Sequence, residues 1–236
     1  EPRDTSGIGG LDDWLASLES QGHYVSCSSG TTGKCAMMNA TAADNEFSGK
    51  ALLQGLLWAG MEPSQDRLMI SCGQVASTAR NKATGRPMFE AVAARDVAPW
   101  VADAPPITIG GITEMVVLRK KIADGTATPG DIEYYEGEAR VREAAIASVA
   151  EQATEALIAN RHRKLHITGM VGQMYQVAAK VRERGYSAKD FAENSTFISG
   201  GLKRAQVPDD YFAVICDTFN FAPQRIYKAY GMQELA

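Results

Sequence analysis

The chain has 236 residues, 45% of them hydrophobic, and a formal net charge of −4 from 24 Lys and Arg against 28 Asp and Glu. That apolar content suffices for a substantial core, and the acidic balance argues against a nucleic-acid partner, because domains that bind nucleic acid carry a basic surface. No apolar run approaches the roughly 18 residues needed to span a bilayer, and the first ten residues do not resemble a signal peptide, so we expect a cytoplasmic protein without a membrane span.

The first half of the chain mixes helical and strand patterns. Residues 11–20 carry apolar side chains at a helical spacing. A second helix is expected to begin within 39–47, with Thr41 as its N-cap, and a strongly apolar helix follows at 50–61. Strands are predicted at 23–29, 36–38 and 67–73, and the less regular stretch beyond them is interpreted as helical at 86–101 and as a Pro-rich loop at 103–111.

The second half alternates more regularly. Helices are predicted at 114–125, 132–160, 172–185 and 208–220, and strands at 164–170, 196–201 and 223–232. Strands that alternate with helices are typical of a mostly parallel sheet flanked by helices, so we expect a single α/β domain. The Ala-rich helix at 132–160 leaves two roles open, covering the sheet or forming the face of a homodimer.

The cysteines do not indicate a metal site or a disulfide framework. Cys27, Cys35, Cys72 and Cys216 include no C-x-x-C pair, and the chain has three histidines, whereas a structural zinc site needs four ligands in close pairs. We expect reduced thiols, with Cys35 and Cys72 buried and inert rather than nucleophilic.

Residues 27–35, CSSGTTGKC, have the composition of a phosphate-binding loop. Aligned on Gly33 and Lys34, a Walker A loop requires Gly at position 28 and Ser or Thr at position 35, where this chain has Ser28 and Cys35. A helix should also follow a Walker A loop at once, yet the next residues have strand character. A Walker A site is therefore disfavoured.

The segment SSGTTGK at 28–34 instead resembles the phosphate loop of the adenylate-forming (AMP-binding) enzymes, [ST]-[SG]-G-[ST]-T-G-x-P-K, which joins two strands. Two further segments occur in the order of that family: Gly-Gly-Leu-Lys at 200–203 and Tyr-Gly-Met-Gln-Glu at 230–234. The first segment together with Thr41 and Asp44 resembles the phenylacetate–CoA ligase branch. The last two are similar to the acyl-protein synthetase of bacterial luminescence operons.

The resemblance implies a role for each matching residue. Ser28, Ser29, Thr31 and Thr32 would bind the triphosphate of ATP, Gly30 and Gly33 would let the backbone approach it, and Lys34 flanks the loop. Gly200, Gly201 and Leu202 would line the adenine pocket, Tyr230 with Gly231 would stack on adenine, Gln233 would approach the α-phosphate, and Glu234 would ligate Mg²⁺. Thr31, Thr32 and Glu234 would be the catalytic residues.

The function implied is ATP-dependent activation of a carboxylate as an acyl-adenylate, followed by transfer to a thiol, with CoA as the expected acceptor. An acyl-protein synthetase and a non-catalytic nucleotide-binding remnant or scaffold remain alternatives. The acid substrate is not identified, since Met170, Met174, Phe197 and Ile198 could line its pocket or belong to the core.

Four positions depart from the family pattern. Cys35 and Ala36 replace Pro and Lys after the loop, Gln233 replaces Thr or Ser, and Lys228 stands where Asn is common. These changes favour a divergent member or one with altered activity. Residues 1–236 are expected to be part of the large domain of such an enzyme, with the small C-terminal lid domain absent, either as a piece of a longer protein or as a natural remnant.

Overall fold

The computed structural model describes residues 6–27, 35–61, 63–74, 78, 85, 89–94, 97–199 and 207–229. Its helices are α1 (Leu11–Ser20), α2 (Ala42–Trp58), α4 (Ile109–Ala123), α5 (Pro129–Ala159), α6 (Val171–Glu183) and α7 (Tyr211–Phe219). Its strands are β1 (His23–Cys27), β2 (Met37–Thr41), β3 (Leu68–Ser71), β4 (Leu165–Met170), β5 (Asn194–Ser199) and β6 (Phe221–Ala229).

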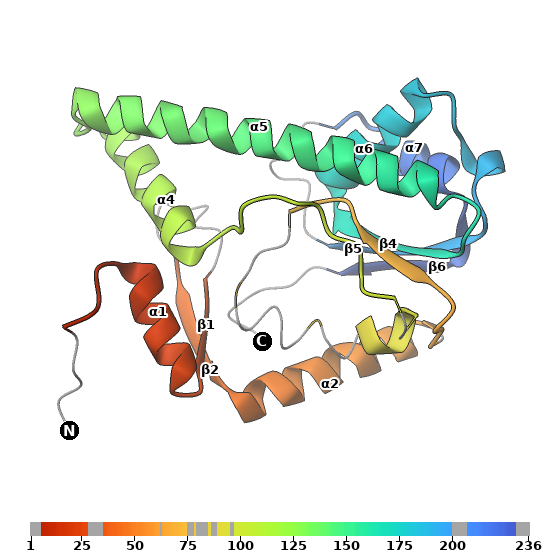
Figure 1. Cartoon of the computed structure of the whole chain (residues 1–236), viewed down its shortest axis with the longest axis horizontal. Helices are drawn as coiled ribbons and strands as arrows, with labels where there is room; N and C mark the ends of the chain where they lie inside the picture. The colour runs from red at the N-terminus through yellow and green to blue at the C-terminus, as the bar shows by residue number, and fades with distance from the viewer. Residues whose placement is uncertain are drawn as a thin grey trace.

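The strands form two sheets. Strands β3, β4, β5 and β6 pair in that order, all in parallel, whereas β1 and β2 form a separate antiparallel hairpin. Helices α5, α6 and α7 cover one face of the four-stranded sheet and α2 crosses the other (Figure 1). The chain is thus an α/β protein with a mostly parallel sheet flanked by helices, as the sequence predicted.

The larger core lies between the sheet and α5, α6 and α7. Side chains alternate across a strand, so Leu165 and Ile167 of β4 face these helices while His166 faces the other way. The first two pack with buried apolar residues of the helices, including Leu157, Met174 and Phe219. Each fully buried side chain of this size contributes roughly 1.5–3 kcal/mol to the free energy of unfolding, which makes this layer the main source of stability.

The opposite face of the sheet has a smaller core. Met69 and Tyr227, from β3 and β6, pack there against Leu56 of α2. The Tyr227 hydroxyl also donates to the carbonyl oxygen of Gly60 at 3.1 Å, which ties the end of α2 to β6. Helix α2 therefore buries one face against the sheet and leaves the other exposed.

Side-chain caps set the starts of three helices. Thr41 caps α2 as predicted, and Asp44 completes a capping box with it. Because the hydrogen bonds of β2 continue to this residue, Asn39 and Ala40 lie in the strand and not in the helix that the sequence predicted to begin within 39–47. The helix then continues without a break, so the predicted helix at 50–61 is part of α2.

Helices α4 and α5 start earlier than predicted for a similar reason. The Thr108 hydroxyl accepts a hydrogen bond from the amide of Gly111, so α4 begins within the expected Pro-rich loop. Thr128 and Asp131 form a capping box, and Pro129 occupies the first turn of α5, where its missing N–H costs nothing.

The predicted helix at 86–101 was wrong over much of its described length. Only 89–92 are helical among the residues described there. Trp100 instead forms a parallel bridge with Ile70 of β3, because its amide donates to the Met69 carbonyl at 2.8 Å. Pro99 interrupts the predicted helix just before Trp100. The residue before a proline avoids helical backbone angles, and proline has no amide N–H to donate to a helical hydrogen bond.

Candidate functional site

The carboxyl ends of three neighbouring strands meet at one edge of the sheet. Met170, the last residue of β4, lies opposite Ser199, the last residue of β5, and Ser199 lies opposite Ala229, the last residue of β6. Ligands of open parallel sheets bind outside this end of the strands, in the loops that follow them. This edge is therefore the expected position of a binding site.

The turn after β3 brings backbone and side chain unusually close at the same edge. A Cβ placed on Gly73 would clash with Oε1 of Gln173, so position 73 accepts no residue larger than glycine while Gln173 keeps its place. That Oε1 accepts a hydrogen bond from the Met170 amide at 3.1 Å. Ser71 reinforces the turn, since its hydroxyl donates to the Gly73 carbonyl at 2.9 Å.

Helix α6 begins directly after β4, so its amino end also points toward this edge (Figure 1). A helix amino end carries a partial positive charge and unpaired amide donors. Met170 stands at this junction and is 52% exposed, whereas Met174 and Ile198 are buried in the core. Phe197 is partly buried against the smaller core. Of the four residues that the sequence left between pocket and core, Met170 is the most exposed.

The hairpin contains the predicted phosphate loop between its strands. Cys27 of β1 lies opposite Met37 of β2, and the pairing continues to His23 opposite Thr41. The expectation that 28–34 joins two strands is confirmed for its flanks. Because a strand and not a helix follows Lys34, the flanks also agree with the argument against a Walker A loop.

The predicted site residues themselves lie outside the described residues. They fall in three segments: Ser28, Ser29, Gly30, Thr31, Thr32, Gly33 and Lys34; Gly200, Gly201 and Leu202; and Tyr230, Gly231, Gln233 and Glu234. Two of the three segments directly follow the adjacent ends of β5 and β6. Strands β1 and β2, which flank the first segment, form a sheet separate from the four-stranded one.

Burial disfavours the reactive thiolate form of Cys27, Cys72 and Cys216. Burial raises the pKa of Cys72 to about 12, so this thiol is protonated and inert at neutral pH, as expected. Burial, and then the neighbouring Cys35, raises the pKa of Cys27. Cys35 is only partly buried, contrary to the expectation for this residue.

A buried polar cluster at the opposite, amino end of the sheet was not predicted. His166 is fully buried, its Nδ1 lies 2.8 Å from the Ser195 hydroxyl, and its Nε2 has no hydrogen-bond partner. Burial, and then the charge of Arg67, lowers the pKa of His166 to about 3. The Arg67 guanidinium reaches the carbonyls of Leu165 and Glu193 at 3.4 and 3.3 Å. The isolated His in KLHIT gave no signal of this cluster, since its partners come from other strands.

A cavity of about 990 Å³ between α1, α4 and α5 was also not predicted. Its lining includes four carboxylates and one ammonium group: Asp12, Asp13, Glu114, Asp131 and Lys121. Asp12 accepts from the Gly110 amide at 2.8 Å, and Asp131 pairs with Lys121 at 3.1 Å. These carboxylates already satisfy the amino ends of α4 and α5, so the cavity offers little to an anionic ligand.

The described part of the chain contains no group of three or more His, Cys, Asp or Glu residues placed to hold a metal ion. It also contains no helix long and apolar enough to cross a membrane. Comparison of the chain with protein-family models, curated proteins and solved structures found no match.

Proposed function

We propose that this chain carries the nucleotide site of an ATP-dependent, adenylate-forming acid–thiol ligase, with CoA as the acyl acceptor. The observation that supports it most is the register of β5 and β6. Ser199 and Ala229 are paired at the carboxyl edge of the sheet, and each is followed at once by a segment that resembles part of an adenylation site. Because the two strands are neighbours and parallel, both segments begin at the edge where such sheets bind ligands.

In this proposal the two segments divide the nucleotide between them. Gly200, Gly201 and Leu202 line one side of adenine, while Tyr230 stacks on its face. Glu234 lies four residues further and supplies a hard carboxylate oxygen, the ligand type that Mg²⁺ prefers. The metal would offset phosphate charge, and water would complete its coordination.

The hairpin segment supplies the hydroxyls for the triphosphate. Ser28, Ser29, Thr31 and Thr32 donate hydrogen bonds to phosphate oxygens, and Gly30 and Gly33 leave room for the backbone amides to approach. Lys34 adds a positive charge at the same loop. Catalysis by such a site consists of positioning and charge stabilisation.

The reaction has two steps. A carboxylate oxygen of the acid substrate forms a bond to the α-phosphorus of ATP, and the bond to the bridging oxygen breaks to release pyrophosphate. The thiolate of CoA then attacks the acyl carbon, and AMP leaves. Met170 lies at the same edge of the sheet and is accessible to the acid substrate.

Calorimetric titration of the chain with ATP tests the nucleotide site without requiring turnover. We expect micromolar to millimolar binding with Mg²⁺ present, and Glu234→Ala should weaken it at least tenfold only when Mg²⁺ is present. Glu133→Ala, an exposed carboxylate on α5, is the matched control. Equal binding by the Glu234 and Glu133 variants, or no binding at all, would contradict the proposal.

Pyrophosphate exchange into ATP separates catalysis from binding. Exchange that depends on an added carboxylic acid and is lost in Thr32→Val supports adenylate formation. Binding without exchange for any acid tested would instead indicate a nucleotide-binding protein that does not activate carboxylates.

A further inference from the structure

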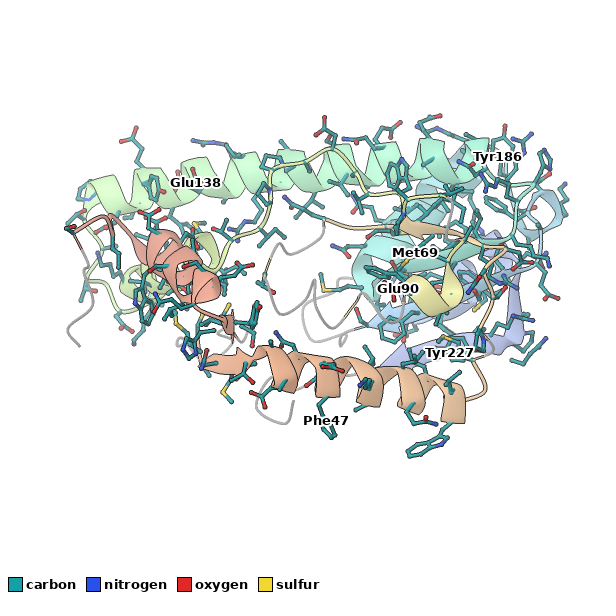
Figure 2. The ribbon with its side chains drawn as sticks, turned by 60° about the horizontal axis from the view of Figure 1, so that its bottom comes forward. Phe47, Met69, Glu90, Glu138, Tyr186 and Tyr227 are labelled. Carbon is teal, nitrogen blue, oxygen red and sulfur yellow. The ribbon has the colours of Figure 1, made fainter. Side chains whose placement is uncertain are left out.

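Helix α2 exposes large aromatic side chains on its outer face, where a solvent-exposed helix usually carries polar ones. Its inner residues, including Leu52, Leu53 and Leu56, pack on the sheet. On the opposite side Phe47 is 75% exposed and Trp58 is 82% exposed, the two largest exposures among the large apolar residues described. Figure 2 shows Phe47 pointing away from the rest of the molecule.

The exposed aromatic residues belong to one stripe. Residues 47, 51, 54 and 58 follow each other at helical spacing, and all four, Phe47, Ala51, Gln54 and Trp58, are exposed. The two rings stand about 16 Å apart along the helix axis. Between them Ala51 is small, and nothing lies within 4 Å of where a Cβ on the neighbouring Gly55 would be, so another helix can approach closely.

The charges of α2 are satisfied within the helix and its cap. Lys50 pairs with Glu46 at 2.6 Å, and Asp44 accepts hydrogen bonds from Thr41. The stripe itself carries no charge. A nucleic acid, an acidic peptide or an anionic lipid surface would need basic residues there, and Lys50 is the single cation of α2. The face therefore fits an uncharged, partly aromatic partner.

The spacing of the stripe is the same in both directions. Phe47 and Ala51 are four residues apart, Ala51 and Gln54 three, and Gln54 and Trp58 four. A two-fold symmetric interface requires a surface that is complementary to itself. When two copies of α2 pack antiparallel, Phe47 of each faces Trp58 of the other, and Ala51 faces Gln54.

We propose that this stripe is the interface of a homodimer in which α2 of one chain packs antiparallel against α2 of a second copy. An aromatic side chain buries roughly 150–250 Å², so the four rings would cover about 600–1,000 Å². This lies below the roughly 1,200 Å² at the low end of specific interfaces, in the range of weak, transient contacts. The dimer is therefore weak and forms only at high protein concentration.

Sedimentation velocity of the whole chain between about 5 and 500 µM tests the interface. We expect the mean mass to rise above the 25.4 kDa of the monomer as concentration increases. Phe47→Ala and Trp58→Ala should each raise Kd at least tenfold, and because both side chains are exposed, the melting temperature should not change. Val141→Ala, which removes another exposed apolar side chain from α5, should leave Kd unchanged.

A charge exchange tests the antiparallel arrangement. Phe47→Glu and Trp58→Lys should each abolish the homodimer, whereas an equimolar mixture of the two variants should associate more than either alone, because in an antiparallel pair the introduced carboxylate faces the introduced ammonium group and one Phe47–Trp58 contact is kept. In a parallel pair neither would occur, so a mixture that associates no more than the single variants would overturn the arrangement. A chain that stays monomeric at about 500 µM overturns the proposal. So does a dimer that only Val141→Ala weakens, or aromatic-dependent binding of the monomer to phosphatidylcholine vesicles.

Discussion

The two ends of the parallel sheet are built differently. At the amino end, polar side chains are buried and bonded to backbone groups: Asn194 and Thr196 are fully buried, and Arg67 is 3% exposed. At the carboxyl end, the residues at or just after the strand ends are small or exposed, as Gly73, Gly169 and Met170 show. The first end holds neighbouring strands together through polar side chains, while at the second end glycines let the strand ends pack closely against Gln173 and Met174, and Met170 is exposed.

This difference separates stability from ligand binding within one sheet. A buried polar group must keep its partners, because losing one leaves the other desolvated and unbonded. Substitutions at the amino end should therefore act on the free energy of unfolding. Substitutions at the carboxyl end should cost less stability and act first on whatever binds there.

Asn194→Ala should give the largest effect. The Asn194 side chain accepts from the Leu165 amide and donates to the Phe219 carbonyl, both at 2.8 Å, and so joins β4, β5 and α7. Its loss leaves two buried backbone groups without partners, which should cost about 2–5 kcal/mol. Urea unfolding would measure this loss, with the exposed Asn39→Ala as the control. A loss below about 1 kcal/mol would show that water replaces the side chain.

His166 should make stability fall in acid. The folded chain keeps this imidazole neutral down to a pKa of about 3, whereas the unfolded chain binds a proton near pH 6.5. The unfolded state therefore binds more protons between these values, and stability decreases as pH falls through that window. Linkage gives a loss of about 2 kcal/mol between pH 7 and pH 5.

His166→Gln should flatten this acid dependence, even though the variant is less stable at neutral pH. The exposed His162→Ala serves as the control for removing an imidazole elsewhere in the chain. Urea titrations at several pH values measure both. An unchanged slope in the Gln variant would assign the acid sensitivity to other groups.

Gly73→Ala tests the carboxyl end. The new methyl group would displace the Gln173 side chain and remove its hydrogen bond to the Met170 amide. Because that side chain is flexible, the cost should be only about 1 kcal/mol. Adding Gln173→Ala should then cost little more, since the bond is already lost. Fully additive effects would mean that the two residues do not compete for space.

Much of the fold could be predicted because its signals are local. The spacing of the apolar residues in α1 and the Thr41 cap depend on residues close in the chain, and both were found. The start of β5 was missed by two residues because Asn194 and Ser195 look like a loop. Their place in the strand comes from partners in β4 and α7, which no local pattern reveals.

The candidate site could be predicted only as motifs. The segments at 28–34, 200–202 and 230–234 were chosen by resemblance, and the structure describes their flanks. That the last two follow paired residues of β5 and β6 depends on sheet order and register. A short sequence motif contains no information on sheet order or register, because both arise from packing between distant parts of the chain.

Lys164→Met should have the smallest effect on the free energy of unfolding. Lys164 lies at the exposed border of the amino end of the sheet. Lys164 lies 2.6 Å from Asp66 and, with Ser64, lowers the pKa of Asp66 to about 2. Both side chains are half exposed, so water and salt screen the pair, and exposed ion pairs contribute about 0–1 kcal/mol. We expect the pKa of Asp66 to rise in the variant, as NMR titration of its carboxyl group would show. The free energy of unfolding should change by less than about 0.5 kcal/mol. A larger loss would mean that the stabilising polar network of the amino end extends to its surface.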